Sequence, residues 1–108
     1  LVEKGSLQYK VEEFTDEAVV KISGWALNRK TLRAGTLNIV LTGQDKQQYI
    51  VKSERLYRPD VRDAFGKRRL AFAGFEAAFI KQNLPKQHYE VSLVLDGDAC
   101  MIGSIVVV

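Results

Sequence analysis

The stretch Tyr89-Glu90-Val91-Ser92-Leu93-Val94-Leu95, followed by Asp96-Gly97-Asp98, decides the fold of this chain. Tyr89, Val91, Leu93 and Leu95 lie at every second position, which is typical of a strand with one buried face. The aspartate-glycine pair behind them favours a hairpin turn, and residues 99–108 are again largely apolar. The stretch therefore predicts a β-hairpin built from the last twenty residues or so.

The same alternation appears in five earlier segments. It runs through residues 7–14, 19–27, 37–42, 47–53 and 75–79, with polar or glycine-containing turns between them. Only one stretch looks helical: Pro59 suits a first helical position, and Gly66 can end the helix in a left-handed conformation. We therefore predict an all-β fold, an antiparallel immunoglobulin-like sandwich of about seven strands with one short helix near residues 59–65.

The predicted core follows from the apolar positions of these segments. Trp25 is its least secure member because both faces of its strand look apolar, so it is either a core residue or an exposed platform for a sugar ring. The full set is Leu7, Tyr9, Val11, Ile22, Trp25, Leu37, Ile39, Leu41, Val51, Val61, Phe65, Phe75, Phe79, Val91, Leu93, Ile105 and Val107.

Length and composition bound the class of protein. The chain has 108 residues, 46% apolar and 27% charged, which fits a single globular domain over residues 1–108. We expect this domain to be excised from a longer chain. No apolar run approaches the ~20 residues of a membrane helix. Cys100 is the single cysteine, so no internal disulfide can form, and we expect a cytoplasmic location, peripheral to the inner face of the membrane through the parent protein.

Positive charge is concentrated in one region. The net charge is +3, and residues 52–69 hold seven Lys or Arg against three acids. Such a patch suits phosphate groups or other anions, although adjacent cations after a glycine also occur as a solvated loop. We predict Arg55, Lys67, Arg68 and Arg69 as a rim that faces an anionic ligand, with nucleic acid the less favoured ligand.

Other polar residues read better as structural. Arg58 and Asp60 flank Pro59, so a charged pair there is expected to pin a corner, with anion binding by Arg58 as the alternative. Asp96 and Asp98 lie too close together for a calcium loop. Cys100 reads as a small buried residue, and the sequence predicts no catalytic residue, metal or cofactor.

Three short motifs in a fixed order resemble a known module. They are Gly24-Trp25-Ala26, Arg58-Pro59-Asp60-Val61 and Gly74-Phe75, followed by His88, Tyr89 and Val91 in a later strand. This order is similar to that of β-sandwich accessory domains in bacterial glycosyltransferases and related proteins of cell-surface polysaccharide and teichoic-acid biosynthesis. In such a domain Gly24, Trp25, Arg58, Pro59, Asp60, Gly74 and Phe75 form the structural motif.

The resemblance implies a non-catalytic module attached to the catalytic domain of a glycosyl- or glycerophosphotransferase. Such a module positions the catalytic domain or holds the growing polymer, so the expected partners are that domain and an anionic glycan or teichoic-acid polymer. A protein–protein docking domain without glycan contact is the alternative, because sandwich strands leave a bare surface for another protein.

Overall fold

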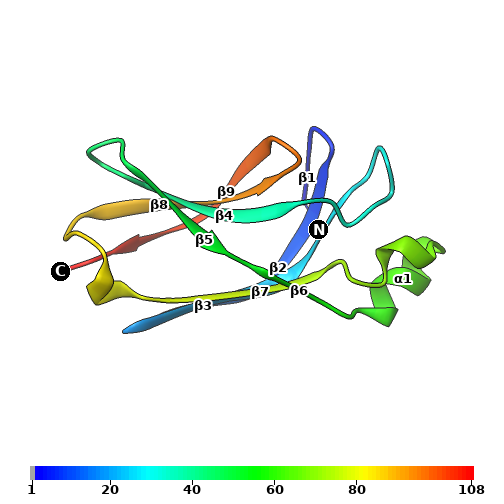
Figure 1. Ribbon diagram of the computed structural model, residues 1–108, viewed down its shortest axis with the longest axis horizontal. Coiled ribbons are helices and arrows are strands. Elements are labelled where there is room, and N and C mark those ends of the chain that lie inside the picture. Colours follow the sequence, from blue (N-terminus) through cyan, green and yellow to red (C-terminus); the bar gives the residue numbers. More distant parts are fainter. Residues whose placement is uncertain (1) are drawn as a thin grey trace.

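Two antiparallel sheets pack face to face in the computed structural model (Figure 1). The structure describes residues 2–108, with side chains from residue 5 onward, so Leu1 of the predicted domain lies outside the described residues. The predicted all-β antiparallel sandwich is confirmed. The first sheet has the strand order β1 (Val2–Lys4), β2 (Leu7–Asp16), β3 (Val19–Asn28), β7 (Gly74–Ile80) and β6 (Glu54–Leu56). The second has the order β5 (Gln48–Lys52), β4 (Leu37–Gly43), β8 (His88–Leu95) and β9 (Asp98–Val106).

The described residues thus form two strands more than the seven predicted segments. The additional strands, β1 and β6, have three residues each, which is too short for an alternating pattern to show in sequence. Between β5 and β6 the chain passes from the second sheet to the first at Ser53, whose hydroxyl donates to the Leu37 carbonyl oxygen at 3.2 Å.

The helix has the predicted bounds. α1 (Pro59–Phe65) begins with proline and ends at Gly66, whose φ of 64° and ψ of 30° lie in the left-handed region. Two short 3-10 turns follow later, η1 (Arg68–Leu70) and η2 (Lys81–Asn83). α1 and η1 lie at one end of the sandwich and the C-terminus at the other (Figure 1).

The main core fills the space between the sheets. Most of the predicted core is buried, whereas Val11, Val51 and Phe79 are half-buried at its margin. The prediction missed five buried members, because alanines carry little apolar signal and strand ends were left out of the set. They are Val20, Ala26, Ala77, Tyr89 and Leu95.

A second, smaller cluster lies outside this core. Leu27, Val61, Leu70 and Ala73 are buried together, with Trp25 and Phe65 packed against them. Trp25 and Leu27 have the opposite parity on β3 from the buried Ile22, so they project from the other face of the first sheet. The Trp25 ring meets the Phe65 ring edge-on with the centroids 6.0 Å apart. Trp25 is therefore a half-buried packing residue under α1.

Two tyrosines place their hydroxyl groups on specific partners. Tyr89 is 1% exposed and donates its hydroxyl to the Pro85 carbonyl oxygen at 2.6 Å, which gives the hydroxyl of this buried side chain a partner in the turn before β8. The hydroxyl oxygen of Tyr9 on β2 lies 3.1 Å from the sulfur of the half-buried Cys100 on β9. Burial raises the pKa of Tyr9 to about 12, with the contact to Cys100 acting in the same direction. The Tyr9–Cys100 contact joins the two sheets.

Candidate functional site

The three sequence motifs meet at one bulge in the first sheet. The pairing of β2 with β3 shifts register between Val11 and Glu13, so Glu12 has no partner residue on β3. Gly24 lies directly opposite, where an added Cβ would be only 2.0 Å from the Lys10 carbonyl oxygen. A glycine is therefore required for the strands to approach this closely, and the bulge directs Glu12 toward Arg58.

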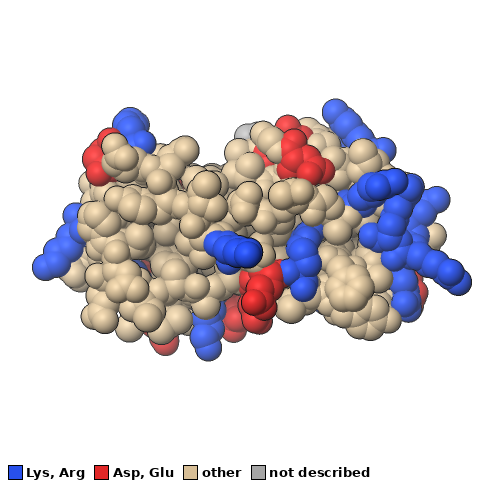
Figure 2. All heavy atoms as spheres, in the orientation of Figure 1, with Lys and Arg blue, Asp and Glu red and all other residues tan. Residues whose placement is uncertain are grey.

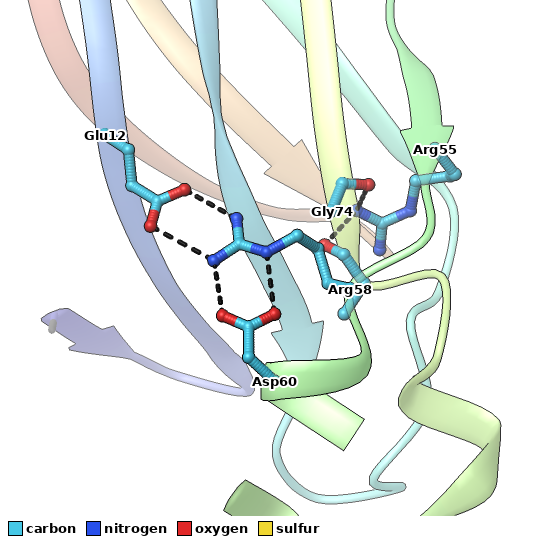
Figure 3. A network of polar contacts seen from close by, with 6 residues as sticks. Glu12, Arg55, Arg58, Asp60 and Gly74 are labelled. Carbon is cyan, nitrogen blue, oxygen red and sulfur yellow. Dashed lines mark hydrogen bonds and ion pairs between the residues drawn. The ribbon is translucent and has the colours of Figure 1, made fainter. Parts of the chain in front are cut away.

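Arg58 is clamped between two carboxylates (Figure 3). Its Nη1 and Nη2 donate to Glu12 Oε1 and Oε2 at 2.5 and 3.1 Å. Its Nε and Nη2 donate to Asp60 Oδ1 and Oδ2 at 2.9 and 2.8 Å. Four of the five guanidinium N–H groups are thus occupied, and the three side chains together carry a charge of about −1. This arrangement does not suit an incoming anion.

The hydrogen bonds shift the pKa values in the cluster in opposite directions. The bond from Arg58 holds the pKa of Asp60 at about 2, below its ordinary 3.8. Bonding to Asp60 and then to Glu12 raises the pKa of Arg58 above its ordinary value. Each charge stabilises the ionised form of the other, so the clamp persists over the whole physiological range of pH.

Gly74 leaves room for the aliphatic part of the Arg58 side chain. A Cβ at this position would lie 2.6 Å from Arg58 Cγ and 2.8 Å from the Leu56 carbonyl oxygen. Gly74 is the first residue of β7 and pairs with Leu56 on the edge strand β6 and with Trp25 on β3, so it lies at the strand end where the Arg58 side chain passes. The motifs containing Gly24, Arg58 and Gly74 are thus parts of one corner, with Pro59 starting α1 and Phe75 buried in the core.

Arg55 does not join the predicted rim, which corrects that assignment. Its Nη2 donates to the carbonyl oxygens of Ala26, at 2.9 Å, and Ala34, and its Nη1 donates to that of Ala73 at 3.1 Å. Nη1 also lies 3.5 Å from the carbonyl oxygen of Gly74 (Figure 3). Burial lowers the pKa of Arg55 to about 10, partly offset by the charge of Asp96. Arg55 therefore joins backbone segments inside the α1 end, a placement that depends on the three-residue strand β6.

The other three predicted rim residues are exposed at the α1 end. Lys67 precedes η1, and Arg68 and Arg69 are its first two residues. Lys67 and Arg68 line a shallow hollow of about 430 Å³ together with Arg62, Asp63 and Gly66. Arg69 is next to the hollow in sequence but does not line it. Lys and Arg side chains gather at this end of the molecule (Figure 2).

The charges of the hollow are only partly compensated. Arg62 donates from Nε to Asp63 Oδ1 at 2.9 Å, and this bond raises the pKa of Arg62. Among the described residues, Lys67, Arg68 and Arg69 have no ion-pair partner. Three uncompensated cations on one exposed turn create a local positive field that attracts an anionic ligand.

An aromatic pair beside the hollow was missed by the sequence analysis. Tyr57 and Phe72 are 54% and 57% exposed, and their ring centroids lie 5.5 Å apart. Tyr57 lies within the basic region 52–69 and Phe72 follows it, but neither belongs to an alternating run, so periodicity gave no reason to select them. Arg62 contacts this pair: its Nη1 donates to the Tyr57 hydroxyl at 3.0 Å, and its Cζ lies 5.8 Å from the Tyr57 ring centroid.

The carboxylates of the last hairpin turn are bound by protein groups. Asp96 accepts from the Thr36 N–H at 3.0 Å and from Asn28 Nδ2 at 2.9 Å, while Asp98 accepts from the N–H and the hydroxyl of Ser6. These bonds lower the pKa values of both aspartates. No group of three or more potential metal ligands occurs within the described residues.

Comparison with protein-family models, curated proteins and solved structures found no match to this chain. Within residues 2–108, no helix has the length and apolar character needed to cross a membrane. The α1 end combines the Arg58 corner with an exposed cationic turn and an exposed aromatic pair.

Proposed function

We propose that this chain is a non-catalytic accessory module of a bacterial enzyme of cell-surface glycan or teichoic-acid biosynthesis, and that its α1 end holds the anionic polymer. The observation that carries the proposal is the exposed turn Lys67-Arg68-Arg69, whose three cations have no ion-pair partner in the described chain. A phosphate-rich polymer supplies the opposite charge at repeated intervals. The parent enzyme is proposed to act on the cytoplasmic side of the membrane.

Two features of the sandwich support an immunoglobulin-like type for this module. The orders β2-β3-β7-β6 and β5-β4-β8-β9 correspond to the A-B-E-D and C′-C-F-G strand orders of such sandwiches. The hydroxyl of Tyr89, near the start of the strand at the F position, bonds to the backbone four residues upstream, as in the tyrosine corner of that fold. The corner built by Gly24, Arg58 and Gly74 gives the motif set of the resemblance a physical role.

Titration of this chain with polyglycerol phosphate, followed by calorimetry at several salt concentrations, tests the proposal. Three neutralised phosphates release about 0.7 counterion each, so log K is expected to fall against log salt with a slope of about −2. The triple replacement of Lys67, Arg68 and Arg69 by Ser should abolish binding and leave the melting temperature nearly unchanged, because exposed charges contribute little to stability.

The matched control removes the same charge elsewhere. Lys46, Lys52 and Lys86 are exposed and lie outside the hollow, so their replacement by Ser should change affinity only slightly. Binding that falls equally in both triple variants would show a response to net charge alone, and the site would be wrong. Transfer or hydrolysis by the isolated chain that depends on one side chain would contradict the non-catalytic part of the proposal.

A second candidate, a protein-docking module, is favoured by the opposite end of the sandwich. A groove of about 410 Å³ there is lined mainly by apolar residues, among them Ala18, Val19, Ile80, Val106 and Val108. The four largest are between 38% and 96% exposed. NMR titration with teichoic-acid fragments separates the two functions: shifted signals at the α1 end support polymer binding, whereas no shifts there would leave the docking function as the better account.

A further inference from the structure

Tyr57 and Phe72 form a fixed aromatic surface rather than two loose side chains. The Arg58 N–H donates to the Ala71 carbonyl oxygen at 2.6 Å, which ties the segment before α1 to the segment before β7. Arg62 holds the Tyr57 hydroxyl at 3.0 Å and is itself held by Asp63. The Tyr57 ring is therefore oriented before any ligand arrives, and the Phe72 ring packs against it with the centroids 5.5 Å apart, so less conformational entropy is lost on binding.

The aromatic pair is continuous with the cationic hollow. Arg62 belongs to both, since it contacts Tyr57 and lines the hollow with Lys67 and Arg68. On the other side, the Ala71 N–H donates to the Arg68 carbonyl oxygen at 3.0 Å, which folds the chain so that Phe72 follows the cations closely. A ligand that extends from the hollow past Arg62 therefore reaches Tyr57 and the ring of Phe72 packed against it.

We propose that Tyr57 and Phe72 are a stacking subsite for a pyranose ring, beside a phosphate subsite at Lys67 and Arg68. The apolar C–H face of a pyranose stacks on an aromatic ring and removes both surfaces from water, whereas the phosphate beside it pairs with the cations. This inference rests on the proposed function and narrows its ligand to a polymer that carries both sugar rings and phosphate groups.

The surrounding charges favour such a glycan over single-stranded nucleic acid. Asp60 and Asp63 are 63% and 71% exposed in their side chains and lie on α1 beside the platform. A nucleic acid carries a phosphate on every nucleotide and usually stacks successive bases on several aromatic residues. Here there is one aromatic pair, and Asp63 lies among the cations of the hollow, so a polymer with more widely spaced charges meets less repulsion than a nucleic acid.

The experiment compares two variants on two probes. Phe72→Ser removes one ring, and Ile50→Ser is the matched control because Ile50 is 71% exposed on β5, outside the site. The probes are polyglycerol phosphate carrying glucose and inorganic polyphosphate, which has the charge but no ring. Phe72→Ser is expected to weaken binding of the glucosylated polymer about tenfold and to leave binding of polyphosphate unchanged. Ile50→Ser should alter neither, and unchanged melting temperatures would show that both variants fold.

Tyr57 supplies a second, conservative test of the ring itself. Tyr57→Phe keeps the ring and loses the bond to Arg62, so it should retain most of the affinity, whereas Tyr57→Ser should lose as much as Phe72→Ser. If variants without either ring bind the glucosylated polymer as tightly as the wild type does, the stacking subsite is overturned and the proposed function stands. If the wild type binds neither probe, the stacking subsite and the proposed function are both overturned. A Phe72-dependent preference for oligo-dT over the glucosylated polymer would identify nucleic acid as the occupant and overturn the glycan.

Discussion

Replacement of Gly74 by alanine tests whether the motif glycine exists to let Arg58 pass. The added Cβ would stand 2.6 Å from Arg58 Cγ and 2.8 Å from the Leu56 carbonyl oxygen, roughly 1 Å inside ordinary contact. Gly74 does not have a positive φ, so the clash is the only new cost. Turning the arginine stem off its rotamer costs about 1 kcal/mol, and moving the Leu56 backbone brings the total to about 2–3 kcal/mol.

A double-mutant cycle separates these two contributions. In the Arg58→Ala background the stem is absent, so Gly74→Ala should cost about 1 kcal/mol less than in the wild type. Urea unfolding with a constant m-value gives each free energy of unfolding, and the single variant should also melt about 10 °C lower.

Gly66→Ala is the control for the loss of a glycine. Nothing lies within 4 Å of a Cβ at Gly66, and its φ of 64° alone should cost about 1–2 kcal/mol, independently of Arg58. Gly74→Ala and Arg58→Ala free energies that add within about 0.3 kcal/mol would refute the reasoning, because residues in contact are expected to couple.

Three further predictions follow from the same geometry. Arg58→Ala should cost about 1 kcal/mol at neutral pH, because water screens the charges of its carboxylate partners. The pKa of Asp60 is about 2 in the folded state against an ordinary 3.8, so the stabilisation is present above pH 3.8 and is lost as the pH falls toward 2. Urea unfolding should therefore show the difference in free energy of unfolding between the variant and the wild type closing over that range. Tyr89→Phe leaves the Pro85 carbonyl oxygen without its donor and should lower the free energy of unfolding by about 1–2 kcal/mol, whereas an unchanged value would mean that water replaces the hydroxyl. Arg55→Met should lower the free energy of unfolding by about 3 kcal/mol, because the carbonyl oxygens that Arg55 binds lose their donor, and it should leave the affinity for polyglycerol phosphate unchanged. A folded Arg55→Met variant that loses affinity in calorimetry would show that Arg55 does belong to the anion-facing rim.

Local signals in the sequence were sufficient for most of the fold. Alternation identified the long strands, because a buried face imposes a period of two on any strand that covers a core. The helix was found with its bounds because Pro59 and Gly66 act through their own backbone angles and need no distant partner.

Features that depend on distant contacts were not predictable. Glu12 reaches Arg58 across 46 residues through a bulge that no local pattern announces. Arg55 looked like one more cation of a basic stretch, although the three-residue β6 turns it toward backbone carbonyls. Tyr57 and Phe72 became neighbours only because β6 and the start of β7 pair, which is a property of the tertiary fold.

Because Cys100 contacts Tyr9 of the opposite sheet, the reactivity of its thiol reports on the separation of the two sheets. Cys100 is the single thiol and is half-buried against a residue of the opposite sheet, so a thiol reagent should react with it faster once β9 moves away from β2. The labelling rate in increasing urea therefore distinguishes two kinds of opening. A rate that rises only with global unfolding would show that the sandwich opens as one unit, whereas a rate that already rises at low urea would show that the β9 side detaches first.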